Sequence, residues 1–227
     1  MSFQIQLLDR IDTSFMVDVY VVDANAVPTA TLDGLRASGR RTVCYFSAGT
    51  WEPWREDAYR FPPSVLGTNP IAVPDERWLD TRDQRVRDLM VQRLVRVRAK
   101  NCDAVHLGLV DLAPANSGFA ISAQDYMDYA RFLAAAARAQ NLGVLYESDD
   151  RFAVELSPHF DALLIFNCIN QGRCAVVAPV RAAGKAEFAV EIAKESDVVP
   201  LCAEARRLGF DMAIKRRDLG PYRVGCP

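Results

Sequence analysis

The sequence predicts an α/β protein built as a single (β/α)8 TIM barrel. Eight apolar runs of strand length recur along the 227 residues, and longer segments of helical period lie between many of them. Most of the runs are continuously apolar rather than alternating, which favours strands covered on both faces. Eight strands alternating with helices in a chain of this length match a small parallel barrel. We therefore expect one domain over residues 1–227.

The predicted strands are, in chain order, residues 4–7, 17–23, 42–48, 104–111, 143–148, 162–168, 187–192 and 211–215. Four connectors have helical period, at residues 29–38, 84–100, 122–140 and 200–208. Gly39 follows the first of these helices as a C′ glycine, and Gly209 follows the last. Ser122 and Asp125 form a capping-box pattern at the start of the third.

The segment 49–83 is the longest connection without clear periodicity, and it is rich in tryptophan, proline and charge. Because it follows a strand, a barrel would place it as a long loop over the C-terminal mouth, where active sites are built. Two compatible interpretations remain: a structured lid in which the tryptophans are packing anchors, and a ligand-binding loop.

The charge balance excludes several kinds of partner. The 27 basic and 29 acidic side chains give a formal net charge of −2, which provides no electrostatic case for binding nucleic acid or an anionic membrane. The longest apolar runs, such as residues 132–137 and 162–166, are far shorter than the roughly 20 residues of a transmembrane helix. The chain opens on a strand-like pattern with no secretory signal, so we expect either a cytosolic protein or one that has lost a leader.

The cysteine pattern does not predict a metal site. Six cysteines permit three disulfides without requiring them in a chain of this size. No two have Cys-x-x-Cys spacing, and only His106 and His159 are available as imidazole ligands. We expect no metal and no cofactor.

Several sequence blocks occur in a characteristic order. They are Cys44-Tyr45-Phe46-Ser47-Ala48-Gly49-Thr50, then Glu52, Trp54-Arg55 and Asp57, then Trp78-Leu79-Asp80, Cys102-Asp103, Ser117-Gly118-Phe119, Cys168 and Cys174, Gly184-Lys185, Val190-Glu191, and Leu208-Gly209-Phe210 through Lys215 to Cys226. This order resembles glycoside hydrolase family 114, which comprises endo-α-1,4-polygalactosaminidase-like (β/α)8 barrels. The resemblance covers nearly the whole chain and implies a carbohydrate-directed protein.

The chain departs from the family pattern at the strand ends that carry its chemistry. Family members usually read Val-Glu-Pro-Asp-Asn after the Cys-Asp pair, with a catalytic aspartate, and this chain has Gly108 at the aspartate position. The family usually reads Asn-Glu-Gln-Cys two strands later, with the second catalytic carboxylate, and this chain has Phe166 at the glutamate position. Between them, a strand that commonly ends in Lys-Asn ends in Tyr146-Glu147.

Glycoside hydrolysis normally requires two carboxyl groups held about 5 to 10 Å apart across the scissile bond. Glycine and phenylalanine supply neither, and removing cooperating catalytic groups typically costs several orders of magnitude in rate. On the family mechanism we expect an inactive or nearly inactive protein. The leading hypothesis is a glycan-binding pseudoenzyme.

Other polar residues remain at the predicted strand ends. We assign ten residues to substrate binding: Tyr45, Ser47, Glu52, Arg55, His106, Asp111, Tyr146, Phe166, Asn167 and Lys215. The catalytic candidates are Asp23, Glu191, Glu147 and again His106. Asp23 and Glu191 have two interpretations. They contact a ligand or take over catalysis, or they form structural pairs within the fold, for example with Lys215.

His106 and Phe166 each have two interpretations. His106 is suited to acid–base chemistry at neutral pH, oriented by Glu147 or Asp111, or it fills space vacated by an acidic residue. Strand alternation puts Tyr146 and Glu147 on opposite faces unless the strand ends between them. Phe166 beside Gly108 provides an apolar surface for a sugar ring, or it closes the pocket.

The resemblance also implies disulfides and a ligand. Cys168 with Cys174, and Cys202 with Cys226, match the family's usual pairs, and Cys44 and Cys102 are possible neighbours. Disulfides would predict an extracellular or periplasmic protein.

The ligand implied by the resemblance is an α-linked polysaccharide rich in amino sugars. A cationic polymer would favour a mouth lined by Asp23, Glu52, Glu147 and Glu191. The alternatives are an enzyme with a relocated site and a protein-interaction barrel whose mouth Phe166 plugs.

Overall fold

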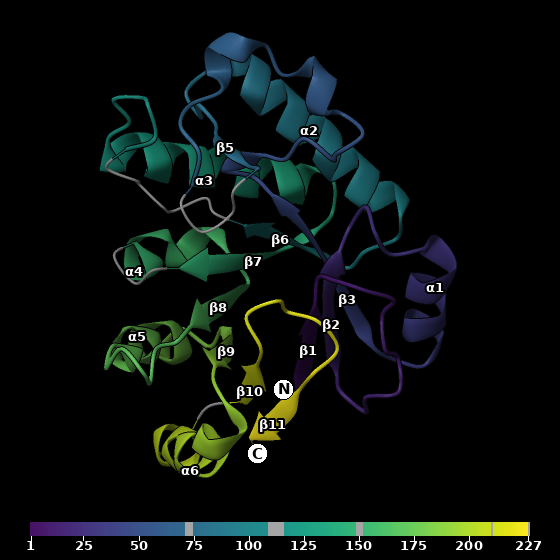
Figure 1. Cartoon of the computed structure of the whole chain (residues 1–227), viewed down its shortest axis with the longest axis vertical. Coiled ribbons are helices and arrows are strands. Elements are labelled where there is room, and N and C mark those ends of the chain that lie inside the picture. The colour runs from purple at the N-terminus through teal and green to yellow at the C-terminus, as the bar shows by residue number, and fades with distance from the viewer. Residues whose placement is uncertain (71–74, 109–115, 149–151, 210, 227) are drawn as a thin grey trace.

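The computed structural model describes residues 1–70, 75–108, 116–148, 152–209 and 211–226. One curled sheet dominates the described chain (Figure 1). Its strands are, in spatial order, β1 (Phe3–Gln6), β2 (Val19–Asp23), β3 (Arg41–Ser47), β6 (Ala104–Gly108), β7 (Gly143–Ser148), β8 (Ala162–Phe166), β9 (Ala186–Ile192), β10 (Met212–Lys215) and β11 (Val224–Cys226). The first eight run parallel, and β11 pairs antiparallel with β10.

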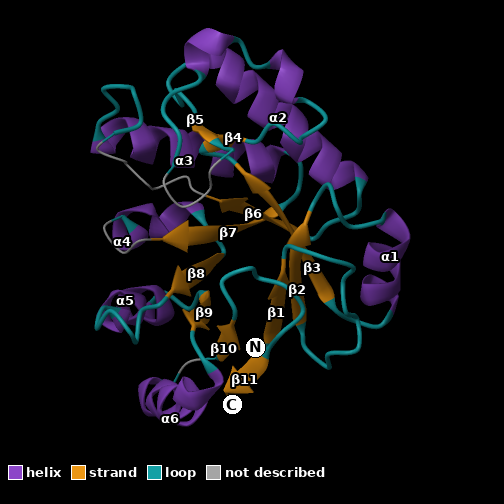
Figure 2. Cartoon of the chain, in the orientation of Figure 1, coloured by secondary structure: helices purple, strands orange, loops and turns teal. Residues whose placement is uncertain are grey.

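Helices cover the outer side of the sheet (Figure 2). They are α1 (Thr29–Ala37), α2 (Gln84–Ala99), α3 (Ala123–Ala139), α4 (Ala153–Leu156), α5 (Val177–Ala182) and α6 (Val198–Leu208). Short 3₁₀ helices are η1 (Ala58–Arg60), η2 (Pro63–Val65), η3 (Ser157–His159), η4 (Cys174–Val176) and η5 (Glu195–Asp197). The strands β4 (Thr50–Trp51) and β5 (Arg77–Trp78) form a separate antiparallel pair within the segment 49–83.

Each of the eight predicted strands overlaps a parallel strand of the structure, and the four predicted helices correspond to α1, α2, α3 and α6. The expected capping box is present, because Ser122 Oγ accepts from the Asp125 amide and Asp125 accepts from the Ser122 amide. Gly39 and Gly209 adopt the left-handed φ values of +81° and +73° that favour glycine after a helix. The sequence interpretation missed α4, α5 and the strands β4, β5 and β11, which are too short to show a period.

The structure supports a curled parallel sheet, whereas the complete eight-stranded barrel that we expected is not confirmed. Among the described residues no backbone ladder joins β1 to β10. The C-terminal segment 216–226 lies between these two edges instead (Figure 1). The Leu219 carbonyl accepts from the Leu7 amide at 3.0 Å, and Arg223 Nε donates to the Phe3 carbonyl at 2.7 Å. The C-terminal segment therefore bridges the two edges of the sheet.

Two apolar clusters hold the sheet in place. Side chains from the inner face form a central cluster: Phe3, Ile5, Val19, Val21, Val43, Leu145, Leu164, Phe188, Val190 and Ala213. The larger cluster fills the layer between the outer face and the helices, and includes Val22, Phe46, Leu94, Leu107 and Leu133. Since successive strand residues point to opposite faces, membership of one cluster or the other shows which face each side chain occupies.

All six cysteines are paired, as Cys44–Cys102, Cys168–Cys174 and Cys202–Cys226. The two pairs implied by the resemblance are thus confirmed, and so is the third. Cys202 to Cys226 ties α6 to the C-terminal strand β11. Separately, no helix in the described part of the chain combines the length and the apolarity of a transmembrane segment.

Candidate functional site

The carboxyl ends of β2, β3 and β6 bring polar side chains together. The parallel register pairs Asp23 with Tyr45 and Tyr45 with His106, and one pleat further along it pairs Ser47 with Gly108. Residues in register on neighbouring strands share a face, so these side chains belong to the inner face at the strand ends. This is the position at which α/β barrels place their ligand sites. We refer to this region as the mouth.

Arg55 links the segment 49–83 to the mouth. Its guanidinium binds Asp23 in a bidentate pair, with N–O distances of 2.8 and 2.7 Å, and binds Glu52 at 2.6 and 2.7 Å. All three side chains are at least nine-tenths buried. Burial lowers the pKa of Arg55, but the hydrogen bonds from Glu52 and Asp23 outweigh it and raise that pKa above its ordinary value. The Arg55 guanidinium is therefore shared by the carboxyl groups of Asp23 and Glu52.

Asp23 is further occupied by the backbone, since its Oδ1 accepts from the amides of Asn25 and Ala26 at 2.8 and 3.1 Å. A carboxylate with this many donors is a poor nucleophile, because each bond stabilises the resting anion. Asp23 thus has the structural pairing that the sequence left open, with Arg55 rather than Lys215 as its partner.

His106 and Glu147 form the second polar pair of the mouth. His106 Nε2 lies 2.8 Å from Glu147 Oε2, with His106 1% exposed and the Glu147 side chain 23% exposed. Among the described residues His106 Nδ1 has no hydrogen-bond partner. The tautomer protonated on Nε2 fits this arrangement, because the ring then donates to Glu147. The structure therefore brings together the pair that strand alternation left open.

Tyr45 lies beside this pair and against Gly108. Its ring centroid is 5.1 Å from that of His106. A Cβ built on Gly108 would lie 2.3 Å from Tyr45 Cε2 and 3.0 Å from its hydroxyl oxygen. Burial, reinforced by the negative charges of Glu52, Glu147 and Glu76, raises the pKa of the Tyr45 hydroxyl well above its ordinary value. The hydroxyl accordingly stays protonated at neutral pH and can donate to a ligand.

A chain of hydroxyls leads from Ser47 to a carboxyl group that the sequence interpretation missed. Ser47 Oγ bonds Thr50 Oγ1, and Thr50 donates to Glu76. Glu76 is 7% exposed, and burial raises its pKa despite the bond from Thr50. The only sequence signal for Glu76 was its place within the loop segment 49–83, just before Trp78.

Phe166 points to the inner face. It packs against the central cluster, stands in register with Val190 and remains partly exposed. A partly exposed ring at a strand end offers an apolar surface to the mouth.

Four predicted site residues lie elsewhere or are occupied by the fold. Tyr146 belongs to the outer cluster and stacks on Phe160 at 5.2 Å. Asn167 Oδ1 accepts from the Ile192 amide at 2.8 Å. Glu191 is fully buried and accepts from the Ile169 and Asn170 amides at 2.7 and 3.4 Å. Lys215 is fully buried and donates to Gln4 Oε1 and the Gly220 carbonyl.

The polar groups of Asn167, Glu191 and Lys215 satisfy backbone or side-chain partners within the fold. Tyr146 instead packs in the outer layer, because it points to the other face of its strand. Burial raises the pKa of Glu191 and lowers that of Lys215 to about 8. Asp111 lies outside the described residues. Within those residues no three histidine, cysteine, aspartate or glutamate side chains form a group able to hold a metal ion.

The sequence profile of glycoside hydrolase family GH114 matches residues 1–227. The chain belongs to family GH114. The resemblance inferred from the ordered sequence blocks is therefore confirmed over the whole chain. Comparison with curated protein sequences gives no match.

Three solved structures share this fold to different degrees. The crystal structure of Ega3 from Aspergillus fumigatus, in complex with galactosamine, is 29% identical, with a TM-score of 0.94 over 99% of this chain and 94% of that one. The glycoside hydrolase domain of PelA from Pseudomonas aeruginosa is 15% identical, with a TM-score of 0.76 over 99% and 97% of the two chains. The α-galactosidase TtGalA from Thermus thermophilus is 12% identical, with a TM-score of 0.59 over 93% of this chain and 57% of that one. The last two comparisons show a similar fold alone.

Proposed function

We propose that this GH114 chain binds an amino-sugar polysaccharide at the mouth and does not cleave it with the family's usual carboxylate pair. The observation that carries the proposal is the contact between Tyr45 and Gly108, in which an aromatic ring fills the space beside the strand end where the family has its aspartate. Phe166, at the family's glutamate position, offers a ring instead of an acid. Neither Gly108 nor Phe166 can transfer a proton to a sugar or attack it.

The charge of the mouth favours a cationic sugar. Glu52, Glu76 and Glu147 all act electrostatically on the Tyr45 hydroxyl, and Arg55 pairs with Glu52 and with Asp23 at the same end of the sheet. An ammonium group entering here would meet negative potential. The complex of Ega3 with galactosamine supports an amino sugar as the ligand class.

The apolar side of a sugar ring has a matching surface. Phe166 is partly exposed at the end of β8, and the C–H face of a pyranose packs on such a ring while its hydroxyls bond polar neighbours. Tyr45 has a hydroxyl without a hydrogen-bond partner among the described residues, and Glu147 is accessible. These three side chains would form the floor and the polar wall of the sugar site.

A hydrolase with a relocated acid pair is the second candidate, and one observation favours it. Glu76 is buried with a raised pKa, as a general acid requires, while the more exposed Glu147 is hydrogen-bonded to His106. A buried carboxyl group with a raised pKa, used together with a second carboxyl group, is the arrangement that glycosidases use. Under this candidate, turnover would vanish in Glu147→Gln.

The three disulfides support a location outside the cytosol, since thiols in the cytosol are kept reduced. We therefore include an extracellular or periplasmic location in the proposal.

Calorimetric titration with soluble α-1,4-linked galactosamine oligosaccharides tests the binding proposal. Glu147→Gln and Phe166→Ala should each weaken affinity about tenfold, the effect of losing roughly 1.4 kcal/mol. Glu204→Gln is the matched control, because Glu204 lies on α6 and pairs with Arg207. Equal affinity in all variants, or no binding by the unmodified chain, would overturn the proposal. The remaining hypothesis would then be a protein-interaction domain.

A further inference from the structure

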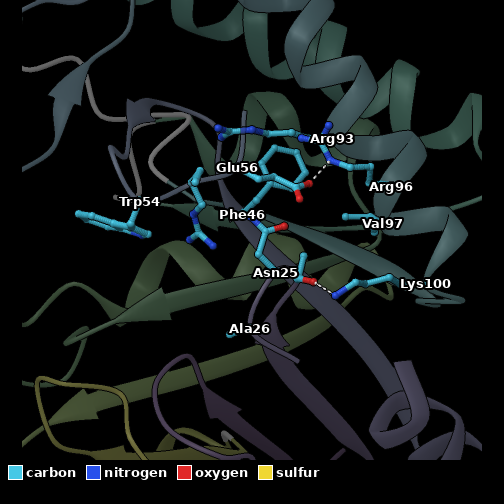
Figure 3. Close-up of a pocket in the computed structure, with 11 residues that line it drawn as sticks. Asn25, Ala26, Phe46, Trp54, Glu56, Arg93, Arg96, Val97 and Lys100 are labelled. Carbon is cyan, nitrogen blue, oxygen red and sulfur yellow. Dashed lines mark hydrogen bonds and ion pairs between the residues drawn. The ribbon is translucent and has the colours of Figure 1, made fainter. Parts of the chain in front are cut away.

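A cavity lies on the other side of β3 from the mouth. Its volume is about 430 Å³, and it is bounded by α2, the residues after β2 and the segment around Trp54 (Figure 3). Its floor includes Phe46 and Val97, which are both 2% exposed and belong to the outer cluster. Because Tyr45 and Phe46 are adjacent on one strand, their side chains point to opposite faces. The cavity therefore lies on the opposite side of β3 from the Tyr45 ring, and Arg55 lines it while also binding Asp23 and Glu52.

The walls of this cavity carry charge that is internally balanced. Its cations are Arg55, Arg93, Arg96 and Lys100, and the carboxylates bonded to or beside them are Asp23, Glu52, Glu56 and Asp57. Arg93 binds Asp57 at 2.8 and 3.0 Å and the Ser47 carbonyl at 2.9 Å. An anion entering the cavity would have to compete with carboxylates already in place, so the charge balance favours an uncharged ligand.

The cavity nevertheless keeps hydrogen-bonding capacity. Bonds to described residues use three of the five N–H groups of Arg93. Lys100 donates to the carbonyls of Ala24 and Val27, which uses two of its three N–H groups. Asn25 is exposed at the opening and adds an amide. Such donors suit hydroxyl and carbonyl oxygens of a neutral ligand.

Trp54 supplies the apolar contact. It is 56% exposed, whereas Trp78 is 8% exposed. In Figure 3 its indole lies at one edge of the cavity, and Lys100 lies at the opposite edge. An exposed indole beside a cavity with polar walls matches the amphipathic character of a pyranose, which has an apolar C–H face and a polar rim.

We propose that the cavity beside Trp54 is an accessory site for an uncharged pyranose unit, such as an N-acetylated amino sugar, stacked on the indole. Its volume is at the lower end of the roughly 300–1,000 Å³ of small-ligand pockets, which fits one or two sugar units. The mouth and this site then have complementary preferences, the acidic mouth for a cationic unit and the neutral cavity for an uncharged one. That both units belong to one polymer rests on the function proposed above.

Two probes separate the sites: α-1,4-linked galactosamine oligosaccharides in fully N-acetylated and in fully de-N-acetylated form, each titrated calorimetrically. Trp54→Ala should weaken binding of the N-acetylated probe about tenfold and change that of the de-N-acetylated probe less than twofold. Trp54→Phe should retain most of the affinity, because it keeps an aromatic face. Tyr59→Ala is the control, since Tyr59 is an aromatic side chain of the same segment, 86% exposed, that does not line the cavity.

Three results would overturn the proposal: no binding of the N-acetylated probe by the unmodified chain, unchanged affinity in Trp54→Ala, or equal weakening of both probes. The function proposed for the mouth fails separately, if the de-N-acetylated probe does not bind or if Glu147→Gln leaves its affinity unchanged.

Discussion

The ring of Tyr45 occupies the space that any side chain at position 108 would need. A Cβ on Gly108 would come within 2.3 Å of Tyr45 Cε2, closer than real Cβ contacts allow. Because Gly108 has no side chain, the aromatic ring of Tyr45 can lie at the end of β6. Placing an acidic side chain at position 108 would require the ring to move.

Gly108→Ala should destabilise the protein by roughly 1–3 kcal/mol, the usual cost of overpacking. The cause is contact with Tyr45, since Gly108 does not have a left-handed φ. Denaturant unfolding of Gly108→Ala, Tyr45→Ala and the double variant measures the coupling. We expect the alanine at 108 to cost much less once the ring is removed. Strictly additive costs would show that the two residues do not compete for space.

Arg55→Met should cost about 3–5 kcal/mol, because it leaves Asp23 and Glu52 buried without their cation. Arg82→Ala is the comparison, since Arg82 pairs with Asp80 at a partly exposed position and should cost no more than about 1 kcal/mol. Chemical denaturation of both variants measures the difference. Similar losses in the two would contradict a buried clamp at Arg55.

Lys215 should make the free energy of unfolding depend on pH in the alkaline range. Burial, together with the charge of Arg223, lowers its pKa from 10.5 to about 8, while Asp218 acts in the opposite direction. Between those pH values the unfolded chain binds more protons than the folded one, so the free energy of unfolding should rise as pH increases from about 8 to about 10.5. The gain is of the order of 3 kcal/mol.

Lys215→Met removes the titrating group and should flatten this part of the pH profile. Urea unfolding of both proteins across that range gives the comparison. If the two profiles rise in parallel, the ammonium group of Lys215 titrates at its ordinary value.

The three disulfides should contribute unequally to stability. Their sequence separations are 58 residues for Cys44–Cys102, 24 for Cys202–Cys226 and 6 for Cys168–Cys174. Loop-closure entropy then predicts losses of about 4, 3.5 and 2 kcal/mol when each pair is replaced by alanine. Thermal unfolding of the three double variants gives the ranking. A reversed order would mean that local packing outweighs the entropy of the unfolded chain.

Much of the fold followed from pattern alone, because buried parallel strands are continuously apolar and long helices show their period. Both signals fail for α4, α5 and β11, which have six residues or fewer. The order of strands and helices along the chain could not show whether the barrel is closed, since closure depends on whether the first and last strands pair.

The site was predicted less completely, because a strand residue's role depends on its face. Glu147 points inward to His106, whereas its neighbour Tyr146 packs on Phe160 in the outer layer. Glu191 likewise binds the backbone after β8. Glu76 was missed because the segment that carries it has no period, and only the folded chain brings it to Thr50.

The most direct test of the account is a time course of reducing ends, with the purified chain at saturating α-1,4-linked polygalactosamine and binding confirmed in the same sample. We predict that the polymer is bound and that reducing ends stay at the level of a protein-free control. Sustained release that disappears in Glu147→Gln would contradict it and establish a relocated catalytic site.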